Sequence, residues 1–124
     1  MKHRTIAYYC IVVGALMAIQ WLFFLATGNV PELETEPLAI VFHLVAELAT
    51  ATALILAGVG LLRRVGWALP VSLVALGMLL YTVINSAGYF AEQGVWAMVA
   101  MFGVLLILTL LAIRRLFAAR EDNW

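Results

Sequence analysis

Four long runs of apolar residues, separated by short polar segments, make up most of the chain. The runs cover about residues 5–26, 38–62, 68–91 and 95–117. Crossing the hydrocarbon core of a bilayer takes about 20 mostly apolar residues in an α-helix, and each run is long enough. The pattern therefore predicts four transmembrane helices, with residues 1–124 forming a single domain.

The polar segments between the runs contain residues that end and begin helices. Glycine and proline occur in residues 28–31, and Pro37 lies where the second helix can begin, because a first helical turn does not use that N–H. Residues 63–66 and 92–94 each end on glycine. Connections this short make consecutive helices antiparallel neighbours. We therefore expect an all-α fold, an integral membrane four-helix up-down-up-down bundle.

The charged residues are divided between the two ends of this bundle. All the basic residues lie on the side that holds both termini and the second turn: Lys2, Arg4, Arg63, Arg64, Arg114, Arg115 and Arg120. The loops on the opposite side carry only acidic charges: Glu32, Glu34, Glu36 and Glu92. Because Lys and Arg in short loops stay in the cytoplasm, both termini are predicted to be cytoplasmic, in the inner membrane.

Composition agrees with a membrane protein and excludes several other classes. The chain is 66% hydrophobic and 11% charged, whereas soluble domains are about half apolar and a quarter charged. A body of 124 residues has too much surface to bury so many apolar side chains, so they must face lipid. Cys10 is the only cysteine, which excludes an internal disulfide. The arginines are topology signals, and no nucleic-acid surface is expected.

Glu47 is the one carboxylate well inside an apolar run. A charge at the bilayer centre costs about 2.5 to over 10 kcal/mol, so such groups normally face a bundle interior. His43 and Thr50 lie one turn before and after Glu47, on the same face of the second helix. This face is predicted to border a polar site.

Polar residues of two other helices are expected at about the same depth in the membrane as Glu47. At about 1.5 Å per residue from the cytoplasmic ends, four residues lie about 20–25 Å up: Gln20, Glu47, Tyr81 and Asn85. His43 and Tyr89 lie about one turn nearer the outer surface. We therefore predict one ligand-binding site in the outer half of the bundle, formed by these six residues.

Small residues also recur along the second helix. Five of them form one stripe: Ala46, Ala49, Ala53, Ala57 and Gly60. Small side chains let membrane helices approach closely where no hydrophobic effect drives them together. The stripe predicts that the second helix is central in the bundle.

Several kinds of chemistry are excluded by the residue inventory. His43 and Glu47 have a spacing that can share a metal ion, but a dedicated zinc site needs three or four ligands. His43 is also the only histidine well inside an apolar run, so bis-His haem ligation within the chain is excluded. Ser86 has no evident base partner. No self-sufficient haem or zinc site and no independent catalytic activity are expected, and the cofactor stays unidentified.

The second helix and the turn after it resemble a known family. The segment Ala46-Glu47, followed by the Leu/Gly-rich run of residues 54–62 and then Arg63, resembles the DoxX-like group of small four-helix bacterial membrane proteins. Those proteins have a carboxylate early in the second helix and a basic turn into the third. Some are membrane subunits of quinone-linked redox complexes, so the resemblance implies that Glu47 lies near a quinone or another amphiphile.

Three functions remain open at this point. The leading one is an accessory or binding subunit for a small amphiphile, quinone-like or lipid-like, which lies in the bilayer with copies of itself or with a membrane complex. The first alternative is a small proton-coupled transporter that uses Glu47. The second alternative is a structural scaffold, in which the polar residues only join helices, at about 0.6–2 kcal/mol for each hydrogen bond.

Overall fold

The computed structural model describes residues 3–28 and 32–121, and within these ranges the chain forms helices and turns but no strand. The elements are α1 (His3–Ala26), α2 (Glu32–Thr35), α3 (Pro37–Arg63), α4 (Ala68–Glu92) and α5 (Trp96–Glu121). The prediction of an all-α fold with four long helices is confirmed. Two details differ from the sequence pattern: the short helix α2 was not predicted, and α5 continues to Glu121 instead of ending near Phe117.

All four long helices are long and apolar enough to cross a membrane. Much of the apolar surface of α1 and α5 is not covered by other helices: only 17% of the most apolar window of α1, and 11% of that of α5, is buried inside the molecule. A large exposed apolar surface of this kind needs lipid or another helix against it. The helices indicate a multi-pass membrane protein, as predicted.

The ends of the long helices are set by residues with left-handed backbone. Gly94 ends the segment after α4 with φ +72°, and the Val95 N–H then donates to the Phe90 carbonyl at 3.0 Å. Such a bond satisfies a carbonyl that the end of a helix would otherwise leave without a partner. Arg64 caps α3 with φ +55°, and its N–H donates to the Leu61 carbonyl at 3.3 Å.

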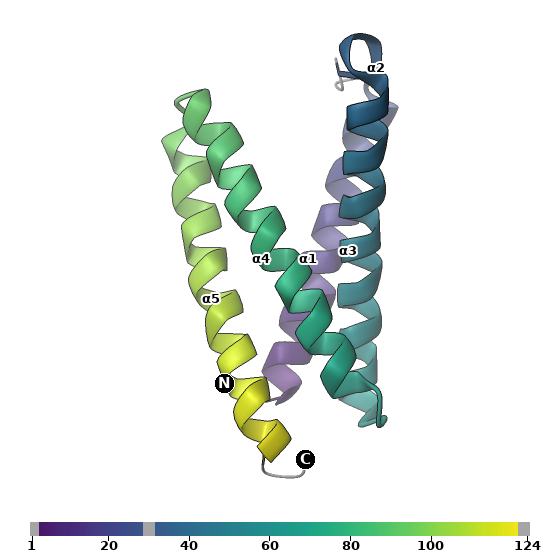
Figure 1. Ribbon diagram of the computed structural model, residues 1–124, viewed down its shortest axis with the longest axis vertical. Coiled ribbons are helices and arrows are strands. Elements are labelled where there is room, and N and C mark those ends of the chain that lie inside the picture. Colours follow the sequence, from purple (N-terminus) through teal and green to yellow (C-terminus); the bar gives the residue numbers. More distant parts are fainter. Residues whose placement is uncertain (1–2, 29–31, 122–124) are drawn as a thin grey trace.

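The long helices are arranged in two pairs (Figure 1). Helix α1 packs along α3, α4 packs along α5, and the pairs are joined where α3 contacts α4. The pairs meet at the end of the molecule that holds both ends of the chain, and they separate toward the other end. The result is a V-shaped molecule, in which the two helix pairs contact each other mainly in one half.

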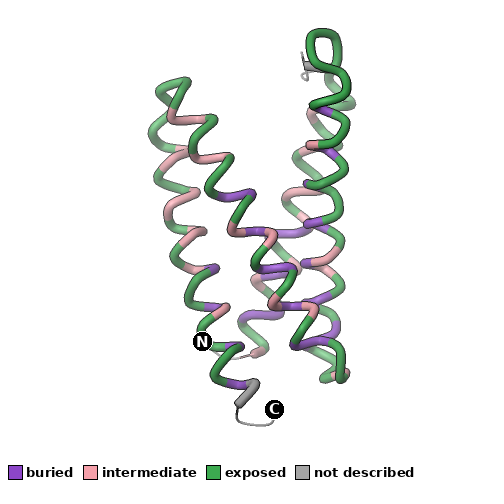
Figure 2. The backbone as a smooth tube through the Cα atoms, viewed as in Figure 1, coloured by how far each residue is buried: buried purple, intermediate pink, exposed green. Residues whose placement is uncertain are grey.

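The hydrophobic core lies in the half where the pairs meet. Figure 2 shows the buried residues concentrated there, while the separated ends are mostly exposed or half-buried. The largest fully buried apolar side chains come from all four long helices: Ile6, Cys10, Leu54, Leu76, Leu79, Val83 and Leu116. One polar contact crosses this core. The Tyr9 hydroxyl of α1 lies 2.8 Å from the Thr109 hydroxyl of α5, and it donates to the Leu105 carbonyl at 3.2 Å.

Helices α1 and α3 approach closely because glycine lies at both sides of their contact. A Cβ atom on Gly14 would lie 2.7 Å from the carbonyl oxygen of Ala51. A Cβ atom on Gly58 would lie 2.6 Å from the carbonyl oxygen of Ala7. Each of these distances is too short for a real Cβ, so the two backbones pack against each other only because these side chains are missing.

The predicted stripe of small residues is therefore wrong in its outer part. Ala57 and Gly60 are buried and Ala53 is half-buried, but Ala46 and Ala49 are exposed. The outer two alanines fall where the helix pairs have separated. The contact with α1 instead uses Ala51 and Gly58, on a neighbouring face of α3.

Candidate functional site

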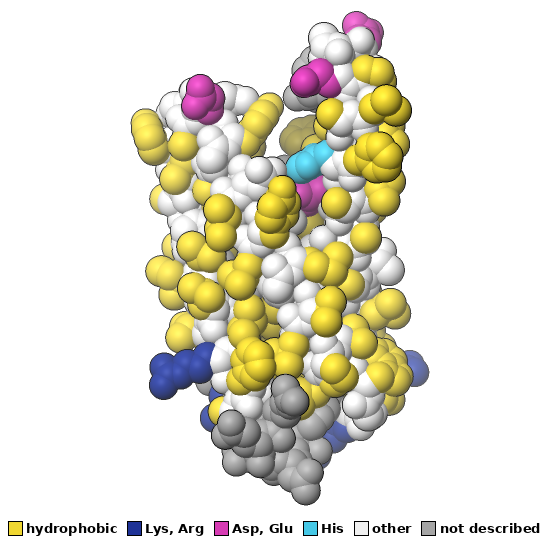
Figure 3. Space-filling view, in the orientation of Figure 1, with side chains coloured by type: hydrophobic (Ala, Val, Ile, Leu, Met, Phe, Trp, Pro, Cys, Tyr) yellow, Lys and Arg dark blue, Asp and Glu magenta, His cyan; other side chains and the backbone are white. Residues whose placement is uncertain are grey.

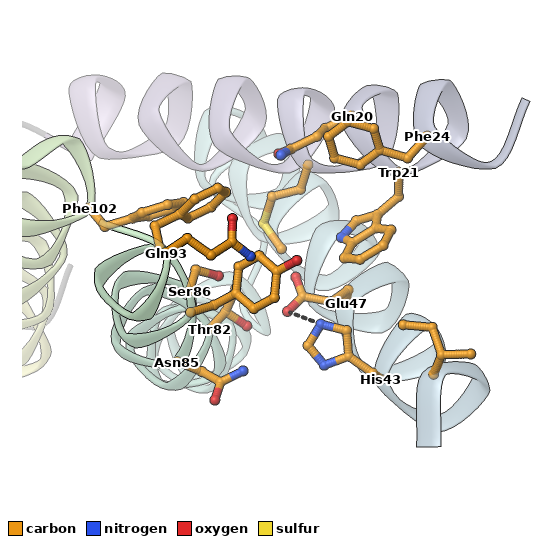
Figure 4. Close-up of a pocket in the computed structure, with 14 residues that line it drawn as sticks. Gln20, Trp21, Phe24, His43, Glu47, Thr82, Asn85, Ser86, Gln93 and Phe102 are labelled. Atoms are coloured by element: carbon orange, nitrogen blue, oxygen red, sulfur yellow. Dashed lines mark ion pairs between the residues drawn. The ribbon is translucent and has the colours of Figure 1, made fainter. Parts of the chain in front are cut away.

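Glu47 lies buried between three helices, with only 6% of its surface exposed. It projects from α3 toward α1 and α4 (Figure 4). The Thr82 hydroxyl of α4 and the Trp21 indole N–H of α1 hydrogen-bond to its carboxylate. A carboxylate in a largely apolar bundle is thus given one donor from each neighbouring helix, as a buried polar group requires.

His43 is the third neighbour of Glu47. Its Nε2 lies 3.6 Å from the Glu47 Oε1, which is longer than a normal hydrogen bond. The His43 ring also packs edge-on against Trp21, with 5.6 Å between ring centroids. Its side chain is 35% exposed. His43 is therefore held loosely against the carboxylate, and its other face is open to a ligand.

A cavity of about 410 Å³ extends from Glu47 into the gap between the two helix pairs. Pockets for small molecules and cofactors are typically about 300–1,000 Å³, mostly apolar, with a few convergent polar groups. Its aromatic lining is Trp21, Phe24, Tyr89, Phe90 and Phe102. Its polar lining is Gln20, His43, Glu47, Thr82, Asn85, Ser86 and Gln93. Its volume and its mixed lining lie within the range of such pockets.

The V shape of the molecule produces this cavity. Figure 3 shows a hollow between the two helix pairs, with a histidine and an acidic side chain visible inside it. Each wall of the cavity is formed by one helix pair. In one wall, Phe90 of α4 stacks on Phe102 of α5, with 5.8 Å between ring centroids. On the other side, Ile40 and Leu44 of α3 pack against Trp21 of α1. Each wall is therefore a packed surface, and the space lies between them.

The structure brings together five of the six residues predicted for the site. Those that line the cavity are Gln20, His43, Glu47, Asn85 and Tyr89. Their positions are unequal: Figure 4 shows Glu47 and His43 together, with Gln20 and Asn85 at opposite margins. Thr50 is buried but takes no part, because its hydroxyl donates to the Ala46 carbonyl of its own helix at 2.8 Å.

Tyr81 lies outside the cavity, with 71% of its surface exposed. Residues four apart are about 40° out of register on a helix, so Tyr81 and Tyr89 point about 80° apart. Thr82 takes the buried position instead. Thr82 continues the row of buried residues that runs along α4, and Ser86, one turn further on, is half-buried.

The sequence reasoning also missed Trp21. A tryptophan in a membrane protein is commonly an interfacial anchor, and nothing local indicates that this one faces inward. Its indole N–H needs a hydrogen-bond partner when it is buried, and Glu47 supplies one. The pairing depends on the crossing of α1 and α3, which the sequence does not give.

The metal-ligating side chains near the cavity are few. Within residues 3–28 and 32–121, no group of three or more His, Cys, Asp or Glu side chains could hold a metal ion. His43 and Glu47 would supply two ligands at most, and a structural zinc site uses four.

The fold and the site define a small multi-pass helical membrane protein with a polar, aromatic-lined cavity. Within that class, the chain belongs to a family described as a domain of unknown function (DUF8058), whose family model matches residues 1–123. No curated protein and no solved structure matches the chain.

Proposed function

We propose that this protein is a binding or accessory subunit of the cytoplasmic membrane, and that its cavity holds a small quinone-like or lipid-like amphiphile. The observation that carries the proposal is the position of Glu47. It lies buried at one wall of a cavity of about 410 Å³, between donors from two other helices. A buried carboxylate beside open space is expensive to maintain in a membrane, and such groups usually mark a functional site.

The two kinds of lining fit the two parts of an amphiphile. The aromatic side chains offer flat apolar surface to a ring or an alkyl chain. The polar group around Glu47 and His43 offers hydrogen bonds to a head group. An ionised carboxylate has about four acceptor positions, and Thr82 and Trp21 occupy only part of that capacity. The weak DoxX-like resemblance of the second helix also favours an amphiphile at Glu47.

We propose an up-down-up-down topology in which both termini are cytoplasmic, so that the cavity opens in the outer half of the membrane. The charges support this orientation. Figure 3 shows the described Arg side chains at one end of the molecule, and acidic side chains at the opposite end. Positive charge in short segments is retained on the cytoplasmic side.

A proton-coupled transporter is the second candidate, and it is favoured by the same buried carboxylate. In a transporter, Glu47 would exchange a proton for the substrate, and the two helix pairs would have to open alternately at each end. The polar core contact between Tyr9 and Thr109 joins α1 to α5 at the closed end. A transport cycle would need this contact to break.

Native mass spectrometry from mild detergent tests the proposal. We expect the wild-type protein to carry a bound small molecule and Glu47→Gln to lose it while keeping its helical circular dichroism. Glu92→Gln is the matched control, because Glu92 is exposed and does not line the cavity. If Glu47→Gln folds, retains every molecule that co-purifies with the wild type and supports wild-type activity, only the scaffold function is left.

A further inference from the structure

The charge inside the cavity is unbalanced. Among the described residues that line it, Glu47 is the only carboxylate, and none is Lys or Arg. The described arginine side chains lie at the opposite end of the molecule (Figure 3). His43 is the one lining group that can become cationic, and it contacts the carboxylate only at 3.6 Å. No fixed positive charge is therefore available to neutralise an anionic ligand.

The hydrogen-bonding character of Glu47 points in the same direction. An ionised carboxylate accepts hydrogen bonds and cannot donate them. The donors already on this carboxylate, Thr82 and Trp21, are directed at Glu47 itself. A phosphate group would also be an acceptor, and its negative charge would be repelled by the ionised carboxylate. A ligand that donates to Glu47 and carries a positive charge would complement it.

The aromatic walls add a second source of attraction for a cation. Trp21 lies beside Glu47, and Tyr89, Phe90 and Phe102 line the space opposite. An ammonium group within about 6 Å of an aromatic ring centre is attracted by the negative face of the ring, most strongly where water is excluded. Aromatic faces around a single carboxylate suit a group that is charged and also partly apolar.

From these observations we infer that the ligand is a hydrophobic organic cation, either a protonated amine or a quaternary ammonium or phosphonium ion. The inference rests on the proposed function and narrows it, because it selects one charge among amphiphiles of similar size. Glu47 supplies the counter-charge, the aromatic walls hold the apolar part, and His43 lies at the open side of the pair.

A pair of ions with matched shape and opposite charge tests this inference. Tetraphenylphosphonium and tetraphenylborate would be measured by equilibrium dialysis against the protein in a nonionic detergent, with decylubiquinone as the neutral amphiphile. We expect the wild-type protein to bind tetraphenylphosphonium saturably, and at least tenfold more tightly than tetraphenylborate. Glu47→Gln should weaken binding of the cation at least tenfold, Glu47→Asp should weaken it less, and Glu92→Gln should leave it unchanged.

The outcomes separate this inference from the proposed function. Equal affinity for the two ions, or an unchanged affinity for tetraphenylphosphonium in a folded Glu47→Gln protein, would overturn the selection for cations. Saturable binding of decylubiquinone without binding of tetraphenylphosphonium would also overturn it, but would leave the proposed function standing. If the wild-type protein binds none of the three probes, both fall. The comparison of the two ions uses only the wild type, so a misfolded variant does not affect it.

Discussion

Glu47 and its neighbours form contacts between three helices at one point. Thr82 and Trp21 donate to the carboxylate from α4 and α1, and His43 lies 3.6 Å away on α3 itself. Leaving a buried acceptor without its donor costs about 1–3 kcal/mol, and more when the acceptor is charged. These contacts therefore orient the carboxylate and also hold the two helix pairs at a fixed separation.

The Thr82 hydroxyl gives a first prediction, because Thr82→Val removes the donor with little change in side-chain shape. We expect Thr82→Val to lower the free energy of unfolding by about 1–2 kcal/mol, since Glu47 loses a hydrogen bond inside the bundle. Unfolding in mixed micelles with increasing sodium dodecyl sulfate would measure it. Thr52→Val is the control: the Thr52 hydroxyl is exposed and bonds only to its own helix, at 2.8 Å from the Leu48 oxygen. Equal losses in both variants would show that the Glu47 contact adds nothing.

At the scale of the helix, some glycines allow two helices to pack closely, whereas others face open space. Helices α1 and α3 pack backbone to backbone at Gly14 and Gly58. Gly60 of α3 is also crowded, because a Cβ there would lie 2.8 Å from the Trp67 ring, whereas nothing lies within 4 Å of a Cβ built on Gly77 or Gly103. The same residue type therefore has a structural role in α3 and none evident in α4 or α5.

This difference predicts opposite results for one substitution at two helical glycines. Gly58→Ala should destabilise the protein by about 1–3 kcal/mol, because its Cβ would lie 2.6 Å from the Ala7 oxygen and would push α1 away. Gly77→Ala should be neutral, or stabilising by up to about 1 kcal/mol, because alanine favours a helix and the space is open. Thermal unfolding of both variants in the same detergent checks this. A Gly58→Ala protein as stable as the wild type would contradict the close α1–α3 packing.

At the scale of the whole molecule, the hydrophobic core occupies one half of the bundle and the cavity occupies the other. The half that contains Tyr9 and Thr109 is filled by side chains from all four long helices. The other half is open because the helix pairs separate there (Figures 1 and 2). The packed half carries the stability of the fold, and the open half is left available for a ligand.

The proposed orientation can be checked with single cysteines in a Cys10→Ala background. Glu34→Cys and Arg64→Cys lie at opposite ends of the molecule, and both side chains are exposed. We expect an impermeant maleimide to label Glu34→Cys in intact cells, and to label Arg64→Cys only after the membrane is permeabilised. Cys10→Ala alone is the unlabelled control, since it contains no cysteine. Labelling of both positions in intact cells would rule out the proposed orientation.

The sequence by itself determined the helices, their approximate ends and the separation of charge. These features depend on residues near one another in the chain: long apolar runs, glycine at Gly28 and Gly94 where the backbone turns left-handed, and arginines in short segments. It also indicated Glu47 as the centre of a site, because a carboxylate inside an apolar run requires an explanation wherever the helix lies. None of these inferences needs the crossing angle of two helices.

The tertiary structure alone decided which polar residues meet. Tyr81 and Thr82 are adjacent in sequence, yet only Thr82 faces Glu47. The rotation of α4 about its own axis is fixed by packing in the half where the helix pairs meet. Ala46 and Ala49 match a packing stripe but lie where the helix pairs have already separated. Trp21 joins Glu47 only because α1 crosses α3 at that height. Rotation and crossing depend on contacts between residues far apart in the chain, such as Gly14 with Ala51, and a periodic pattern along a single helix does not contain them.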